Sequence, residues 1–352
     1  MRMIHTLAAG FALALPLSAQ EQPAHSASEA VAQSRTPTPS PGEIVVAAPA
    51  KDWVAIAPAD LLVMTLAPDR DGKPRQAIIQ LMPSPFSQGW VGNIRKLAAA
   101  HWWDGLSINR VQDNYVVQWG DAEAEDKAKA KAVPSGLNAV SASEYTADLG
   151  TTYLDQSSVA AFANLPLRKA ISHQFIGLQT SLVRDPYAIA GLFWQGWPLA
   201  MGIWSAQENP NTTIAWPVHC YGMVGVGRDL APDTGSGAEL YTVIGHAPRH
   251  LDRNIALVGR VVEGIEHLSS LPRGSGALGF YERAEQRVPI VSIRLVSAVP
   301  AAEQPRFQYL GTESESFARY ADGRANRRDP FFNVPAGGAD ICNIPVPVRR
   351  AP

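Results

Sequence analysis

The residues most suited to chemistry lie in one segment, His101–Asp121, with the sequence HWWDGLSINRVQDNYVVQWGD. Two tryptophans and an Asp-Gly turn come first, and β-branched and aromatic residues follow. A single arginine, Arg110, stands in the middle of this apolar stretch. We predict a loop and then a strand from Leu106 to Trp119, which projects Arg110 into a concave, partly apolar surface. The alternative is a half-buried strand whose arginine extends back to water.

Three other groups of residues are weaker candidates for chemistry. His246 and His250 have a spacing that suits a metal, but no cluster of cysteine or carboxylate ligands accompanies them, so we expect no metal site. The glycines of Gly222–Gly227 lack the following helix and acidic residue of a dinucleotide-binding loop. Ser236 lies outside any Gly-x-Ser-x-Gly pattern of a catalytic serine. We therefore expect no cofactor.

The size and charge of the chain limit the classes of function. Its 352 residues suffice for one large domain with extensions or for two domains. The formal net charge of −2 argues against nucleic acid or an anionic membrane as the main partner. Because no window holds about eighteen uninterrupted apolar residues, we expect no stable membrane insertion.

The N-terminus has the pattern of a secretory signal peptide. Basic residues precede a short apolar run, Leu7–Leu17, and small residues follow it. We predict cleavage near Ala19, so that residues 1–19 are the signal peptide and the mature protein is periplasmic or secreted. In an oxidising compartment the cysteines Cys220 and Cys342 can pair, and the alternative is two separate thiols.

The elements that must position Arg110 are mainly strands. Residues 20–52 are rich in Ala, Ser, Pro, Gln and Glu, which predicts a flexible linker before a folded part that starts near Trp53. Helical patterns do not alternate with strands, so we predict a mostly β fold, a closed eight-stranded antiparallel barrel capped by two helices. The strands are predicted at Leu61–Leu66, Gln76–Met82, Leu106–Trp119, Tyr221–Gly227, Leu240–Ile244, Asn254–Val261 and Val288–Val296, and the helices at Ser87–His101 and Val262–Ser269.

Two long segments fall outside the barrel pattern. Residues 122–216 form an insertion that starts with a solvated charged stretch, and residues 300–352 form a C-terminal extension with little periodicity. Short elements are expected in the insertion at residues 145–148, 159–162 and 178–182. Its Trp-rich piece, Gly191–Trp204, is either an exposed aromatic platform for peptide or glycan or a loop folded over its own small core.

Together these segments resemble the cyclophilin family of peptidyl-prolyl cis–trans isomerases. The resemblance covers about residues 60–121 and 217–298 and makes residues 53–299 a cyclophilin-like domain with an insertion at 122–216. Its clearest part is the opening segment, which matches the family at Trp103-Asp104-Gly105, Arg110, Tyr115, Gln118 and Gly120-Asp121 without a gap. The pieces GMVGVGRD, GAELYTVI and LDRNIALVGRVVEGIE are similar to three further family strands.

The resemblance implies an enzyme that acts on proline-containing exported polypeptides without a metal or cofactor. Arg110 is implied as the cation that stabilises the twisted prolyl bond, and Gln118 as the residue that orients it and binds the substrate backbone. The substrate-binding residues implied by the same alignment are Tyr115, Val116, Val226, Gly227, Arg228, Glu239, Tyr241, His250, Leu251 and Ile255.

Several of these positions depart from the family pattern. Glu239 replaces a glutamine and adds a carboxylate near the groove, while His250 and Ile255 replace a pocket tryptophan and histidine. These changes favour slow or selective turnover. They also motivate two alternatives, a cyclophilin-fold protein that binds exported chains with little or no isomerase activity, and a structural protein of the cell envelope. The sequence leaves the oligomeric state open.

Overall fold

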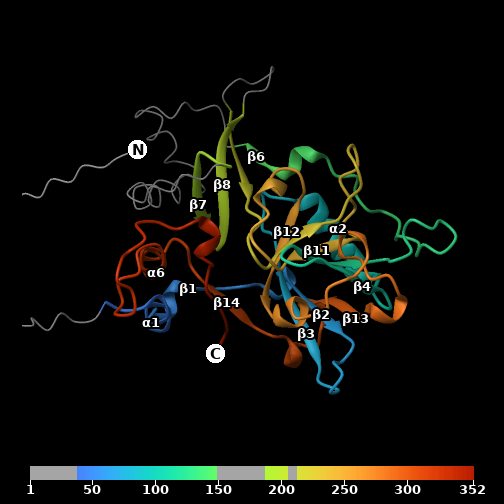
Figure 1. Cartoon of the computed structure of the whole chain (residues 1–352), viewed down its shortest axis with the longest axis horizontal. Helices are drawn as coiled ribbons and strands as arrows, with labels where there is room; N and C mark the ends of the chain where they lie inside the picture. The colour runs from blue at the N-terminus through green and yellow to red at the C-terminus, as the bar shows by residue number, and fades with distance from the viewer. Residues whose placement is uncertain (1–37, 149–186, 205–211) are drawn as a thin grey trace, which may run out of the picture. The chain divides into compact units, whose positions relative to one another are not determined.

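The computed structural model describes residues 38–148, 187–204 and 212–352, and these form mostly β-structure (Figure 1). The predicted signal peptide, much of the predicted linker and the short elements expected at 159–162 and 178–182 lie outside the described residues. Within the described ranges, no helix combines the length and apolar character needed to cross a membrane.

The centre of the fold is a closed antiparallel barrel of eight strands, which confirms the predicted fold class. Closure leaves no exposed sheet edge and fixes the strands around one interior. Around the barrel the strands follow the order β10 (Met223–Val226), β11 (Leu240–Val243), β5 (Val116–Gly120), β4 (Ser107–Val111), β13 (Val288–Leu295), β2 (Leu61–Leu66), β3 (Arg75–Leu81) and β12 (Leu257–Glu263).

Two helices cap the barrel, as the sequence predicts. Helix α2 (Gln88–Ala99) has apolar residues at three- and four-residue spacing, and it packs them against β12 and β13. Trp90, Ile94 and Leu97 are fully buried on this face. The short helix α5 (Glu266–Ser269) lies against β3.

The segment 106–119 forms a hairpin, so the prediction of one continuous strand there is wrong. Strand β4 ends at Val111 and β5 begins at Val116, with a tight turn between them. The turn contains Asn114 with φ +49°, a conformation that asparagine tolerates better than most residues. The hairpin brings the two halves of the opening segment side by side and so places Arg110 next to Gln118.

The described part of the insertion builds a four-stranded sheet in the order β6 (Ala147–Asp148), β9 (Thr212–Pro217), β8 (Trp197–Trp204), β7 (Ala190–Trp194). The piece predicted as a platform or a loop is the β7–β8 hairpin, with Gln195 and Gly196 both at positive φ in the turn. Trp194 and Trp197 are buried in the main core, so they do not form an exposed platform.

The C-terminal extension is ordered and joins the N-terminal end of the described chain. Strand β1 (Trp53–Ala55) pairs with β14 (Phe307–Leu310), which pairs with β15 (Val348–Arg350). Helix α1 (Pro41–Val46) packs on helix α6 (Glu315–Ala325). The last part of the predicted flexible linker is therefore structured. A capping box between Ser40 and Glu43 starts α1 although the segment is rich in proline and alanine.

Cys220 and Cys342 form a disulfide that joins the barrel to the C-terminal extension. The bond links residues 122 positions apart in the sequence. Cys220 is buried and Cys342 is half-buried.

Candidate active site

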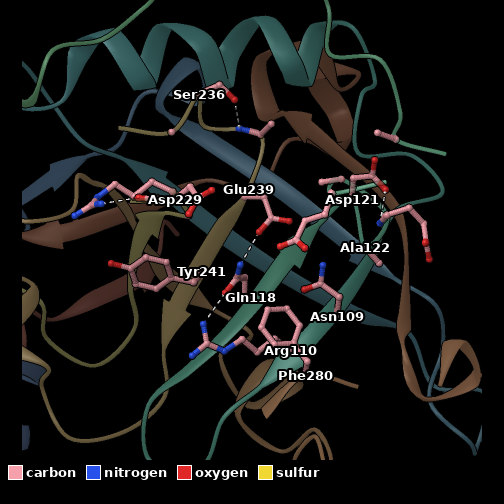
Figure 2. Close-up of a pocket in the computed structure, with 18 of the residues that line it drawn as sticks. Asn109, Arg110, Gln118, Asp121, Ala122, Asp229, Ser236, Glu239, Tyr241 and Phe280 are labelled. Atoms are coloured by element: carbon pink, nitrogen blue, oxygen red, sulfur yellow. Dashed lines mark hydrogen bonds between the residues drawn. The ribbon is translucent and has the colours of Figure 1, made fainter. Parts of the chain in front are cut away.

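Arg110 and Gln118 face each other across strands β4 and β5. The pairing runs from Ile108 opposite Trp119 to Arg110 opposite Gln118, which makes Asn109 the extra residue of a β-bulge. Because side chains alternate along a strand, one extra residue changes the face to which Arg110 points. Arg110 Nη1 consequently donates to Gln118 Oε1 at 3.0 Å (Figure 2).

A glycine-rich loop, residues 272–281, holds Arg110 from the other side. Arg110 Nε donates to the Leu278 carbonyl at 2.7 Å, and Phe280 forms a backbone bridge with Arg110. Arg110 Nη2 donates to the side-chain oxygen of Gln112. Together with the bond to Gln118, these bonds use three of the five N–H groups of a guanidinium and fix its direction.

The Arg110 guanidinium also lies close to two aromatic rings. Its Cζ atom is 5.7 Å from the ring centroid of Tyr115 and 5.4 Å from that of Phe280, distances at which a cation is attracted to the face of a ring. Burial lowers the pKa of Arg110, while interactions with Tyr115 and Glu239 oppose that shift. Because the ordinary pKa of arginine is far above neutrality, the side chain keeps its charge.

Glu239 lies beyond Gln118, just before strand β11. Gln118 Nε2 donates to Glu239 Oε2 at 2.5 Å, so Gln118 connects the arginine to the carboxylate (Figure 2). Burial raises the pKa of Glu239, and hydrogen bonds from Gln118 and Asn109 oppose that shift. The charge of Asp121 raises the pKa of Glu239 further.

An apolar pocket lies beside Arg110 on strands β5 and β11. Val116 and Tyr241 are buried in one hydrophobic cluster, and Tyr115, Leu251 and Ile255 pack partly buried against it. All five residues line a groove of about 1000 Å³ that also includes Arg110, Gln118 and Glu239. The groove therefore combines an apolar pocket with a cation at its edge.

A buried hydrogen-bond network supports the floor of this pocket. The Tyr241 hydroxyl lies 2.9 Å from His219 Nε2, and His219 Nδ1 lies 2.8 Å from Asp252 Oδ1. Arg249 Nε donates to Asp252 Oδ2 at 2.7 Å. Because the Arg249 guanidinium pairs with Asp252, the buried carboxylate has a compensating charge, and His219 connects that carboxylate to the Tyr241 hydroxyl.

Most of the predicted binding residues line the groove. Gly227 and Arg228 do so near Glu239, and Arg228 is tied to the Asn254 carbonyl through Nε and Nη2 at 3.1 and 2.9 Å.

Two predicted residues lie elsewhere. Val226 is fully buried in the main core, because it lies on the inward face of β10. His250 is exposed and lies outside the groove lining, where its ring stacks on Tyr115.

Several residues of the site escape prediction from the sequence. Leu278 and Phe280 hold Arg110 from about 170 positions further along the chain. His219 lies outside the motif segments and joins Tyr241 to Asp252, a contact that the motif containing Asp252 does not indicate. The run of glycines at residues 274–279 signals a close backbone approach, but it does not show what the loop approaches.

The weaker candidates of the sequence do not assemble a second site in the part of the chain that the structure describes. No group of three or more histidine, cysteine or acidic side chains there is placed to hold a metal ion. Ser236 accepts a hydrogen bond from the Ala238 amide and takes part in a turn.

The family model of cyclophilin type peptidyl-prolyl cis-trans isomerase/CLD matches residues 89–295, which is more than half of the chain. The chain therefore belongs to the cyclophilin-type peptidyl-prolyl cis–trans isomerases, and it is an enzyme of the peptidylprolyl isomerase class. A search of curated proteins finds no match.

A solved cyclophilin shares the fold. Cyclophilin AquaCyp293 from Hirschia baltica is 19% identical, with 85% of this chain and 93% of that chain covered at a TM-score of 0.56. A cyclophilin type peptidyl-prolyl cis-trans isomerase from Cryptosporidium parvum, crystallised in the presence of the dipeptide Ala-Pro, is 9% identical. Its alignment covers 66% of this chain and 98% of its own at a TM-score of 0.34.

Proposed function

We propose that this chain isomerises Xaa-Pro bonds in exported polypeptides, with Arg110 as the catalytic cation over the apolar pocket. The observation that carries the proposal is the Arg110 guanidinium, held in one direction by Gln118 and Leu278 at the edge of an apolar pocket.

The chemistry of the prolyl bond explains why this arrangement suffices. A planar prolyl amide is stabilised because the nitrogen shares its lone pair with the carbonyl group. Rotation localises that pair on nitrogen, and an N–H of Arg110 aimed at it stabilises the twisted state more than either planar state. The reaction breaks no covalent bond, so it requires no nucleophile.

The pocket residues have matching roles in this proposal. Tyr241, Val116, Leu251 and Ile255 take up the proline ring, since burial of apolar surface is their main contribution. Gln118 keeps Arg110 in place, and the groove along Gly227 accommodates the residue before proline.

The function is tested by measuring cis–trans exchange of a short Xaa-Pro peptide with the purified full-length chain. The variant Arg110→Ala should lower kcat/KM by about 100-fold or more, as expected for removal of one preorganised electrostatic group. The matched control is Arg95→Ala, because Arg95 lies on α2 and bonds to Asp60 away from the groove. Equal rates for the wild type and Arg110→Ala would instead indicate a binding protein without isomerase chemistry.

We also propose that the protein is exported. The signal-peptide pattern of residues 1–19 supports this location, and so does the Cys220–Cys342 disulfide, because disulfides persist mainly in oxidising compartments. N-terminal sequencing of protein from a soluble periplasmic or secreted fraction should begin near Gln20. Recovery of only the uncleaved chain from the cytosol would contradict export.

A further inference from the structure

Glu239 ends a chain of side-chain contacts that starts at Arg110. Arg110 Nη1 donates to Gln118 Oε1 at 3.0 Å, and Gln118 Nε2 donates to Glu239 Oε2 at 2.5 Å (Figure 2). We propose, resting on the proposed function, that Glu239 is a positioning residue whose ionised carboxylate orients the Gln118 amide and thereby holds Arg110 toward the substrate. The consequence is an isomerase that loses activity in acid through this one group.

The direction of each contact follows from the chemistry of the groups. A guanidinium only donates and an ionised carboxylate only accepts, whereas the amide of Gln118 has one accepting end and one donating end. Ionised Glu239 therefore requires the NH₂ group of Gln118, which leaves the amide oxygen for Arg110. Protonated Glu239 carries a donor of its own, so the amide can turn around and present N–H groups to Arg110, where two donors oppose each other.

The surroundings of Glu239 keep it within this chain of contacts. The facing charged groups among the described residues are Arg110 on β4 and Asp121 after β5, and Asn109 supplies a further hydrogen bond. Two neighbours of Glu239 are glycines, and a side chain at either position would collide with it. A Cβ atom at Gly227 would lie 2.9 Å from Glu239 Cβ, and one at Gly120 would lie 2.8 Å from Glu239 Oε1. The Glu239 side chain thus fills a space left by missing side chains.

The carboxylate orients Arg110 without forming a direct ion pair with it. The hydrogen-bond acceptors of Arg110 among the described residues are the neutral oxygens of Leu278, Gln118 and Gln112. A carboxylate in direct contact would compete with the prolyl nitrogen for the guanidinium N–H groups. Placing Gln118 between the two charges keeps Arg110 directed and its positive charge available. Because burial raises the pKa of Glu239, this control acts above the pH at which an exposed glutamate titrates.

The test is the rate of peptide isomerisation from about pH 4 to about pH 8, with each protein normalised to its own rate at the upper end. The wild-type rate should fall about tenfold toward acid. Glu239→Gln should lose this acid limb, because a glutamine oxygen accepts from Gln118 at every pH. The matched control is Asp229→Asn, an exposed groove carboxylate that bonds to the Leu230 amide, and it should keep the limb. An unchanged acid limb in Glu239→Gln would overturn the proposal.

A second measurement separates this inference from the proposed function. The side-chain amide resonances of Gln118, followed by NMR over the same pH range, should shift in the wild type and stay constant in Glu239→Gln. This readout does not need catalysis, so an inactive wild type would refute the isomerase function while the amide shift still tests the contact chain. Identical Gln118 titrations in both proteins would overturn the role of Glu239.

Discussion

Three neutral oxygen atoms hold the Arg110 guanidinium, and the nearest link to a negative charge passes through Gln118. At the scale of single residues, the site therefore depends on hydrogen-bond direction more than on charge neutralisation. The opposite arrangement occurs beneath the pocket, where Asp252 and Arg249 pair directly and both are buried. There the two charges compensate each other, and Tyr241 connects them to the pocket through His219.

This buried pair leads to a prediction about stability. Asp252→Asn should lower the free energy of unfolding by about 3–5 kcal/mol, the usual cost of removing one partner of a buried pair. The matched control is Asp60→Asn, whose partner Arg95 is partly exposed, and it should cost less than about 1 kcal/mol. Urea denaturation of both variants near neutral pH measures the difference, and similar losses would contradict the assigned role of Asp252.

The same carboxylate gives a pH dependence with a definite sign. Burial acts to raise the pKa of Asp252, but the hydrogen bonds and charges of His219 and Arg249 outweigh it, so the pKa is lowered in the folded protein. A lowered pKa contributes stability that is complete above the unfolded value of about 3.9 and is lost as the pH falls through the folded pKa. The acid-unfolding curve of Asp252→Asn should accordingly lack this contribution.

At the scale of elements, the loop 272–281 acts as a second support for the active-site hairpin. The loop approaches β4 closely because Gly279 has φ +83° and lies against the backbone of Val111 and Gln112. Its Leu278 carbonyl is then positioned to accept from Arg110 Nε. The geometry of the Arg110 side chain thus depends on a segment that is distant in sequence.

Substitution of that glycine tests the loop. In Gly279→Ala the added Cβ would lie 2.7 Å from Gln112 Cα and 2.8 Å from the Val111 carbonyl oxygen, so the loop must move away from Arg110. We expect kcat to fall by about tenfold, the effect of losing one hydrogen bond to a charged group. Gly72→Ala is the control, because Gly72 also has positive φ but has open space and lies in the β2–β3 turn. Equal kinetic losses in both variants would count against the role of the loop.

At the scale of the whole molecule, the two ends of the described chain are built into the fold. Residues 38–55 and 306–350 contribute the three-stranded sheet and the α1–α6 pair, and Phe317 and Tyr320 belong to the same hydrophobic core as the barrel. The Cys220–Cys342 disulfide joins this extension to the segment that carries His219. The disulfide therefore ties the extension to the region beneath the apolar pocket.

The disulfide should make a large contribution to global stability. The double variant Cys220→Ser/Cys342→Ser should lose about 2–5 kcal/mol of unfolding free energy, because the bond restricts a long segment in the unfolded chain. Reductant should destabilise the wild type by a similar amount and leave the variant unchanged. Equal mobility of the wild type on reducing and non-reducing gels, with both thiols alkylated, would show that the bond does not form.

Local patterns in the sequence determine most of the barrel. The alternating strands and the helical pattern of 87–101 predict elements that the structure contains, because each pattern expresses contacts between near neighbours. The same reasoning failed between Leu106 and Trp119, where the turn at Asn114 divides one apolar run into two strands. It also did not predict the regular elements within residues 300–352, whose periodicity is weak. Strand β14 forms there because it pairs with β1, which is distant in the sequence.

The sequence by itself determined that an arginine and a glutamine eight positions apart share an apolar β segment, and the motif around them indicated the isomerase family. Only the tertiary structure decided how that arginine is held. The site depends on contacts between strands or between distant segments. These contacts involve the bulge at Asn109, the Leu278 carbonyl, the Glu239 carboxylate and the His219–Asp252 pair. Such contacts are selected by barrel closure, which aligns strands by their pairing and not by their order in the chain.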